Sequence, residues 1–358
     1  MSFTERVQKL LSQLGPFIAL IIIIIIFNRA DNYFGDGNFL TVKNFRKISN
    51  SAALIAVPAM GMTLIIIAGG IDLSAGTALT LCGTVLALVM KNSTVVNGDP
   101  GFTLMMLQAV SLAMLTGCLC GLINGALISL SRVVPFIVTL GTMTIFLGVG
   151  QILANESTVY ADLEKFPGWL RHLCYTGKVD DNYLSFFGFH PNIPTSVLIM
   201  IVLTILVSLF LKYTVMGRKF FAIGSSESTA RLCGINVPVT NALIYTIAGI
   251  FVAIGGIMYF ANVKNGNPKD GMGMELQIIA AVVLGGGSLS GGRGSVIGTV
   301  VGAFIITVIR NGCGLLSIPN TYTHIIIGCI IILAVIIDQL RHGSPEWFFR
   351  LIRKKSSG

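Results

Sequence analysis

Charged residues are rare along this chain, and they divide it into long apolar stretches. Ten stretches of sixteen residues or more contain no Asp, Glu, Lys or Arg, and they run over 10–28, 48–71, 73–90, 100–131, 133–155, 182–211, 232–263, 276–292, 294–309 and 311–337. A charge at the centre of a bilayer is costly, and a spanning helix needs about 20 mainly apolar residues. The pattern therefore predicts an all-α polytopic membrane protein with about ten transmembrane helices.

Glycine interrupts this pattern at two places that resemble each other. The sequence GGIDLSAG at 69–76 aligns with GGGSLSGG at 285–292, and the stretches 276–292 and 294–309 are short for a membrane span. We expect Gly-rich broken or re-entrant segments at these positions. Matching broken helices in two duplicated halves would indicate a transport pathway. The frequent use of glycine at helix breaks explains the similarity equally well.

Composition agrees with a membrane protein and excludes several other classes. Charged residues make up 11% of the chain, against about 25% in soluble domains, and mean hydropathy is +0.83. The net charge of +9 does not indicate a nucleic-acid binder, because so apolar a chain has no surface for a basic stripe. The stretch 10–28 is not followed by a small-x-small cleavage site, and we therefore expect it to be the first helix rather than a signal peptide.

The distribution of charges predicts an orientation. With the N-terminus inside, the loop 212–231 has four bases and one acid on the inner side, and the loop 156–181 has five acids and three bases on the outer side. The basic loop 29–47 falls outside and opposes this arrangement, so that Lys and Arg number 13 inside and 11 outside. We expect both termini in the cytoplasm, an outer loop at about 155–194 and a basic cytoplasmic tail at about 339–358.

Catalytic and nucleotide-binding motifs are absent from the sequence. It contains no Walker A motif, no nucleophile elbow, no HExxH zinc motif and no metal-ligand spacing of cysteines. The Gly-rich segment 285–294 lies between two apolar helical runs rather than between a strand and a helix, which favours a turn or a broken helix over a phosphate-binding loop. We expect a chain that is not an enzyme and binds no cofactor or metal.

Asp72 is the most isolated carboxylate, between two apolar runs. An acid at membrane depth is a candidate pathway or gating residue. An Asp after two glycines also fits the start of the next helix, where it would accept hydrogen bonds from free amide groups. Both interpretations remain open. The candidate pathway or gating residues, with Asp72, are Ser74, Asn124, Ser288 and Ser290.

The loop at about 212–238 has the signals of a short helix. Ser225 or Ser226 fits its N-cap, Glu227 its first turn and Gly234 its end. A short helix inside a basic cytoplasmic loop would give a partner protein a rigid element to bind. A solvated connecting helix is the alternative.

Four motifs in this chain resemble a known family, the membrane permease subunits of bacterial ABC importers for monosaccharides of the ribose, galactose and xylose type. They are GMTLIIIAGGIDLSAG (61–76), NGALISLSRVVPFIVTLGTM (124–143), MGRKFFAIGSSESTARLCGINV (216–237) and ELQIIAAVVLGGGSLSGGRGSVIGTVVGA (275–303). The resemblance covers nearly the whole chain and implies a single transmembrane permease domain over 1–358.

The resemblance also implies partners and a mechanism. It implies a homodimer in the bacterial cytoplasmic membrane, a separate cytoplasmic ABC ATPase that binds ATP and Mg, and an extracytoplasmic sugar-binding protein that delivers a monosaccharide. A short helix in a cytoplasmic loop of such permeases docks in a groove on the ATPase. The resemblance places that coupling element at Gly224, Glu227, Ala230, Arg231 and Gly234.

Other transport functions remain as alternatives. An ion-coupled secondary transporter needs buried carboxylates or unwound carbonyl sites, for which Asp72 is the one plausible candidate in the sequence. Permeases similar to this family also serve nucleosides or a sugar-derived signal. A membrane-embedded enzyme would need a His, Asp or Glu cluster within the spans, and the sequence has none.

Overall fold

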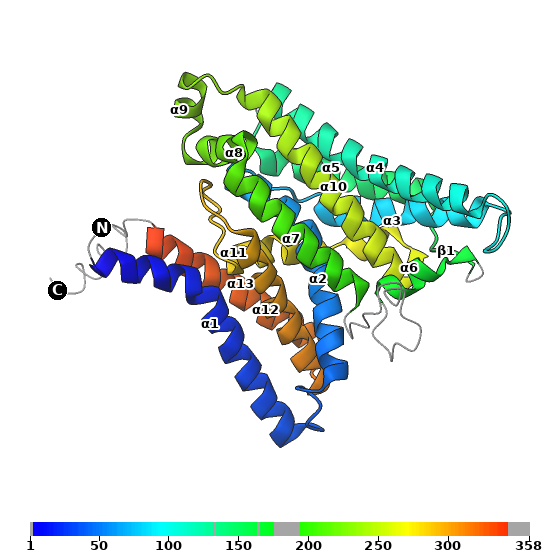
Figure 1. The fold of residues 1–358 in the computed structure, drawn as a ribbon, viewed down its shortest axis with the longest axis horizontal. Helices are drawn as coiled ribbons and strands as arrows, with labels where there is room; N and C mark the ends of the chain where they lie inside the picture. Colours follow the sequence, from blue (N-terminus) through cyan, green and yellow to red (C-terminus); the bar gives the residue numbers. More distant parts are fainter. Residues whose placement is uncertain (1–2, 132, 163–164, 175–193, 343–358) are drawn as a thin grey trace.

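The computed structural model describes residues 3–131, 133–162, 165–174 and 194–342, and this part of the chain is almost entirely helical (Figure 1). The helices are α1 (Phe3–Phe34), α2 (Val42–Ile67), α3 (Ala75–Asn92), α4 (Phe102–Ser131), α5 (Pro135–Leu153), α6 (Gly168–Leu173), α7 (Thr195–Tyr213), α8 (Val215–Ser225), α9 (Glu227–Leu232), α10 (Val237–Val263), α11 (Met274–Leu284), α12 (Val296–Leu315) and α13 (Asn320–His342), with a 3₁₀ turn η3 (Pro268–Gly271). The all-α prediction is confirmed.

Eight helices in the described residues are long and apolar enough to cross a membrane. They are α1 from Leu14 onward, α2, α3, α4, α5, α7, α10 and α12. The polytopic prediction is confirmed, but the expected number of ten differs from these eight. Helix α11 has only 11 residues, because glycines end it at Gly285, and α13 is not among the eight. The apolar stretch 311–337 is also divided, since α12 ends at Leu315 and α13 begins at Asn320.

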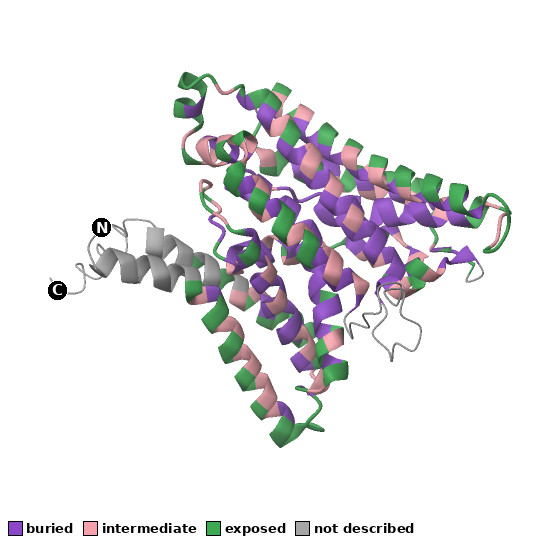
Figure 2. Cartoon of the chain, viewed as in Figure 1, coloured by how far each residue is buried: buried purple, intermediate pink, exposed green. Residues whose placement is uncertain are grey.

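The outer helices expose large apolar side chains, as a bilayer requires. Ile21, Ile22, Ile25 and Ile26 of α1 are each at least half exposed, and α4, α5 and α7 expose many Leu, Ile and Val side chains. Figure 2 shows exposed residues in green, with intermediate ones in pink between them, on α1 and along the outer face of α4. In water so large an apolar surface would drive aggregation. In a membrane the lipid tails cover it.

Helix α2 lies at the centre of the bundle, where it packs against α10, α12, α11 and α7. Of its most apolar 18-residue window, 94% is buried, compared with 11% for α1. Glycine lets neighbouring helices come close: a Cβ on Gly117, Gly121 or Gly125 of α4 would meet the backbone of α10. Their spacing of four residues places all three on one face of α4, as in the small-residue interfaces of membrane helices.

The connections gather at two ends of the bundle, which we name after one element of each. The α9 end comprises 68–74, 214–236 and 285–295. The β1 end comprises 35–41, 93–101, 154–162, 165–174, 264–273 and 316–319. Figure 1 places α8 and α9 at one extremity of the view and β1 and α6 at another. Consecutive long helices alternate in direction, so their connections alternate between these two ends.

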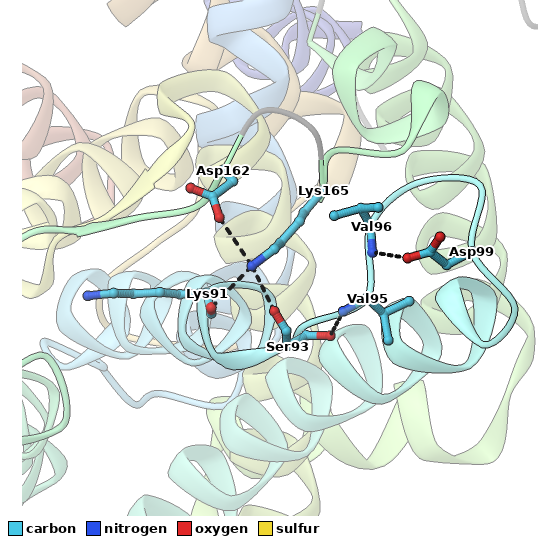
Figure 3. A network of polar contacts seen from close by, with 7 residues as sticks. All are labelled: Lys91, Ser93, Val95, Val96, Asp99, Asp162 and Lys165. Carbon is cyan, nitrogen blue, oxygen red and sulfur yellow. Dashed lines mark hydrogen bonds and ion pairs between the residues drawn. The ribbon is translucent and has the colours of Figure 1, made fainter.

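Part of the expected outer loop is ordered at the β1 end. Strand β1 (Val159–Tyr160) pairs antiparallel with β2 (Asn265–Gly266), in the register Val159 to Gly266. The Lys165 ammonium, almost buried, donates to the carbonyls of Lys91 (3.3 Å) and Ser93 (2.7 Å) and lies 3.1 Å from the Asp162 carboxylate (Figure 3). These contacts hold the loop against the connection between α3 and α4. Residues 163–164 and 175–193 of the expected loop, and 343–358 of the expected basic tail, lie outside the described residues.

Candidate functional site

The loop predicted to couple to a partner contains two short helices joined at a bend. Helix α8 begins after Thr214, whose hydroxyl accepts a hydrogen bond from the Gly217 amide (3.0 Å). Helix α9 begins after Ser226, whose hydroxyl accepts from the Thr229 amide (3.3 Å). Ser226 is therefore the N-cap, and Ser225 belongs to the end of α8. The sequence signals predicted α9 but not α8.

Glycine ends α9 in the expected way. Gly234 has φ of +80°, and its amide donates to the Arg231 carbonyl (3.0 Å). The next amide, of Ile235, donates to the Ala230 carbonyl (3.1 Å). These two bonds form a Schellman motif, which needs a left-handed residue and hence favours glycine. The position of Gly234 in the sequence predicted this end correctly.

Helix α9 is fixed on one side and exposed on the other. Ala230 is buried in a small cluster with Ile223 of α8 and Val237 of α10. Glu227 and Arg231, one turn apart on α9, form an ion pair with a shortest distance of 2.6 Å, and both side chains are about half exposed. Leu232 at the end of the helix is 89% exposed. The helix thus exposes a charged pair and an apolar side chain while Ala230 packs against α8 and α10.

Gly224 joins the end of α8 to the two Gly-rich breaks. A Cβ on Gly224 would overlap the carbonyl oxygen of Ile67 at the end of α2 and would lie 2.5 Å from the Gly292 amide. The Gly292 amide itself donates to the Ile67 carbonyl (2.8 Å). We call this meeting point of α2, α8 and the 285–295 loop the glycine junction. Only a residue without a side chain fits at Gly224, because backbone atoms surround its α-carbon.

The first break places Asp72 in a buried polar network. One carboxylate oxygen of Asp72 accepts from the Ser74 amide (2.8 Å), the Ser74 hydroxyl (2.6 Å) and the Asn124 amide group (3.3 Å). The Asn124 side chain also donates to the Ser74 hydroxyl (2.7 Å) and accepts from the Thr142 hydroxyl (2.6 Å). All four residues are buried. The network connects the start of α3 to α4 and α5.

The hydrogen bonds of Asp72 include local capping and a contact between helices. The N-cap of α3 is Ser74, which has no side-chain cap of its own, and Asp72 binds the Ser74 amide just before the helix. Asp72 also binds Asn124, 52 residues further along the chain. Local capping alone would not need that second contact. Asp72 therefore holds the break and α4 together.

Three of the five predicted pathway residues meet in this network, and two do not. Ser288 and Ser290 lie in the loop of the second break, where Ser288 is buried and Ser290 is exposed. The backbone of Ser288 accepts from the Gly291 amide (3.0 Å) and donates to the Arg293 carbonyl (3.2 Å), which closes this loop on itself. Thr142 is not among the residues predicted from the sequence, and its position in the motif 124–143 is the one signal that could have indicated it.

Comparison with known proteins agrees with this architecture. Residues 44–335 match the family model described as branched-chain amino acid transport system / permease component. The chain is 34% identical to the ribose import permease protein of Escherichia coli strain K12 over 84% of this chain and 87% of that protein. It is 34% identical to the ribose import permease protein of Bacillus subtilis strain 168, over 92% of this chain and 93% of that protein.

A third relative is named for a different sugar. The chain is 30% identical to the galactose/methyl galactoside import permease protein of Escherichia coli strain K12, over 93% of this chain and 95% of that protein. No solved structure matches. A permease component is a transport subunit rather than an enzyme, and in such systems the ATPase is a separate chain. The match over most of its length shows that the chain belongs to the family of monosaccharide ABC importer permeases, multi-pass membrane proteins homologous to bacterial inner-membrane permeases.

Proposed function

We propose that this permease carries a simple sugar across the bacterial cytoplasmic membrane, as a homodimer powered by a cytoplasmic ABC ATPase and supplied by an extracytoplasmic sugar-binding protein. The names of the relatives support a pentose or hexose as substrate. In this proposal the α9 end and both termini face the cytoplasm, and the β1 end faces the binding protein.

The observation that carries the proposal is the exposed and well-supported helix α9. Its Glu227 and Arg231 side chains are accessible to a partner, and Ala230 anchors it against α8 and α10. A force applied to α9 would pass to the glycine junction at the end of α8, since Gly224 lies only three residues before the start of α9 and packs against Ile67. ATP-driven movement of the ATPase would then shift the end of the central helix α2.

The substrate path needs few ionisable groups in this mechanism. A neutral sugar is held by transient hydrogen bonds. ATP in the partner determines which of two conformations the permease adopts, and the difference between their affinities for the sugar sets the direction of transport. The family has the ATPase as a separate chain, so ATP and Mg would be bound there. Asp72 would stabilise the first break rather than carry an ion.

The test replaces both exposed charges of α9, in the variant Glu227→Ala/Arg231→Ala. We expect uptake of labelled ribose or galactose to fall at least about tenfold and co-purification with the ATPase to weaken, because docking contacts of this kind contribute a few kcal/mol. The ion pair itself contributes only about 0.5 kcal/mol to the helix, so the amount of folded permease should stay the same. Arg29→Ala, an exposed charge on α1, is the matched control.

A charge exchange separates docking from helix stability. The variant Glu227→Arg/Arg231→Glu restores an ion pair within α9 but reverses the charges that a partner meets. We expect it to remain defective. Normal uptake and normal ATPase association in either double variant would contradict the coupling assignment. Uptake in vesicles without ATP, driven by an ion gradient, would contradict the ATP-driven mechanism.

A further inference from the structure

A polar cavity of about 560 Å³ opens at the β1 end, between α2, α10, α11, α12 and η3. Of its fourteen lining residues, ten are polar and four are apolar. Its volume lies in the range of about 300–1,000 Å³ that is typical of small-molecule sites. None of the sequence-predicted pathway residues lines it. The cavity is thus a second polar region, separate from the Asp72 network.

Hydrogen bonds between helices fix the walls of this cavity. The Asn50 side chain donates to the Asn262 side chain (3.3 Å) and accepts from the Ser196 hydroxyl (2.6 Å). Asn44 and Asn311 exchange two side-chain hydrogen bonds, of 2.9 and 2.8 Å. These pairs link residues more than 140 positions apart in the chain. Helix packing therefore preorganises the part of the lining that α2, α10 and α12 contribute.

Three half-buried polar side chains of the lining have no such partner. Within the described part of the chain, the Arg310 guanidinium, the Tyr259 hydroxyl and the Gln277 amide are half-buried and make no hydrogen bond or ion pair with the protein. Arg310 lies inside α12, one of the membrane-spanning candidates. A charge within a span is costly and marks substrate paths and similar functional sites. In the sequence Arg310 is the single base that separates two apolar stretches.

The remaining charges of the lining add acceptors and donors. One carboxylate oxygen of Asp270 accepts from the Asn267 amide group (2.8 Å), which leaves the second oxygen available. Lys47 is exposed at the mouth. The cavity thus offers donors at Arg310 and Lys47, an acceptor at Asp270, and groups that do both at Tyr259 and Gln277.

We propose that this cavity is a carbohydrate-binding chamber, in which Arg310, Tyr259 and Gln277 hydrogen-bond the hydroxyl groups of the sugar as it enters from the β1 end. The proposal rests on the transport function proposed above and adds the site that recognises the substrate. A sugar hydroxyl both donates and accepts, and so it matches a lining that contains donors, acceptors and groups of both kinds.

The composition of the lining favours a sugar over a branched-chain amino acid. The apolar lining residues are Leu54, Ile55, Met272 and Met274, and the last two come from the segment around η3. A branched aliphatic side chain would need a continuous apolar wall, because burying it against amides and charges gains little. Contact with amides costs a sugar no binding free energy, because its hydroxyl groups form hydrogen bonds with them. Its affinity here would be modest, since the mouth is open to solvent at Ser51 and Lys47.

The first test uses three substitutions that remove hydrogen bonds: Arg310→Gln, Tyr259→Phe and Gln277→Ala. Each would be expressed with its own ATPase and binding protein, and uptake of labelled ribose and galactose would be measured over a range of concentrations. We expect Arg310→Gln to lower uptake about tenfold or more, the value of one charge-assisted hydrogen bond. Tyr259→Phe and Gln277→Ala should each lower it several-fold.

Two further variants distinguish loss of sugar binding from loss of folding. Lys269→Gln removes an exposed charge at the same end that does not line the cavity, and it should transport normally. Ser51→Trp fills the cavity from its exposed mouth without changing a buried residue, and it should block uptake while the complex still assembles and hydrolyses ATP.

The outcomes distinguish the chamber from the transport function. Failure of the unaltered complex to take up either sugar with ATP would overturn the proposed function. Normal uptake by that complex together with normal uptake by Arg310→Gln and Ser51→Trp would overturn the chamber alone. Uptake of leucine that Arg310→Gln abolishes, with sugar uptake unaffected, would also overturn it, since the occupant would then be an amino acid.

Discussion

The two Gly-rich breaks begin in the same way and end differently. After α2, the Gly69 amide donates to the Ile66 carbonyl and the Gly70 amide to the Ile65 carbonyl. After α11, the amides of Gly286 and Gly287 make the equivalent two bonds, to Val283 and Val282. Gly69 and Gly286 both have positive φ, +84° and +87°. Both helices therefore end in a Schellman motif.

Beyond this motif the chain takes two courses. The first break returns into the bundle within a few residues, so that α3 begins at Ala75 and Asp72 and Ser74 are buried. The second continues to Ser295 before α12 begins, and its Ser290 is exposed. The sequence alignment pairs Ser74 with Ser290, yet the structure gives them opposite environments. The backbone match is also displaced by one residue, since Gly69 corresponds to Gly286 rather than to Gly285.

A short sequence repeat thus predicts a helix end but not the course of the chain beyond it. A Schellman motif depends on about six consecutive residues. The residues after the motif are placed by the helices available to receive them: Asn124 and Thr142 lie beside the first break. The second break instead lies against Gly224 and Ile67 at the glycine junction.

Of the substitutions at the two breaks, replacement of Asp72 should change the free energy of unfolding most. Asp72→Ala leaves the buried Ser74 amide and Ser74 hydroxyl without their acceptor and removes one of the two acceptors of the Asn124 amide group. Each buried unsatisfied group costs about 1–3 kcal/mol. We expect a loss of about 3 kcal/mol or more in the free energy of unfolding, measured in mixed detergent micelles. Asp72→Asn, which keeps one acceptor oxygen, should lose less. Equal losses for the two variants would show that the negative charge, rather than the hydrogen bonds, stabilises the break.

Replacing the left-handed glycines should affect both breaks alike. A Cβ on Gly69 would meet Gly224 at 3.9 Å, an ordinary contact, and a Cβ on Gly286 would meet nothing within 4 Å. The cost is therefore the backbone cost of a left-handed alanine, about 1–2 kcal/mol. We expect Gly69→Ala and Gly286→Ala to lower the free energy of unfolding equally. A much larger effect of Gly69→Ala would mean that the glycine junction, and not the helix end, determines the residue there.

The smallest expected effect comes from Ser290, and its aligned partner Ser74 should differ from it. Ser74→Ala removes a buried hydroxyl that donates to Asp72 and accepts from Asn124, at a cost of about 1–2 kcal/mol. Ser290→Ala changes an exposed residue and should stay within about 0.5 kcal/mol. The same unfolding measurement compares the two. Similar values would contradict the different environments of the two serines.

Local features of the site could be predicted from the sequence because they depend on neighbours within one or two turns. Ser226, Glu227 and Gly234 indicated the start and the end of α9, and the structure confirms both. The number of spans was less predictable. Glycine shortens α11 to 11 residues, and an apolar stretch gives no sign of how much of it is helix.

The sequence by itself determined that this is an all-helical membrane permease of the monosaccharide importer family, since apolar length, charge spacing and four motifs are properties of consecutive residues. Only the tertiary structure brought Asp72 to Asn124, Gly224 to Ile67, and Arg310 into a cavity with Tyr259 and Gln277. These contacts join residues that lie far apart in the chain. Whether these residues come into contact depends on how glycine-lined helix faces pack, and no local pattern in the sequence encodes that packing.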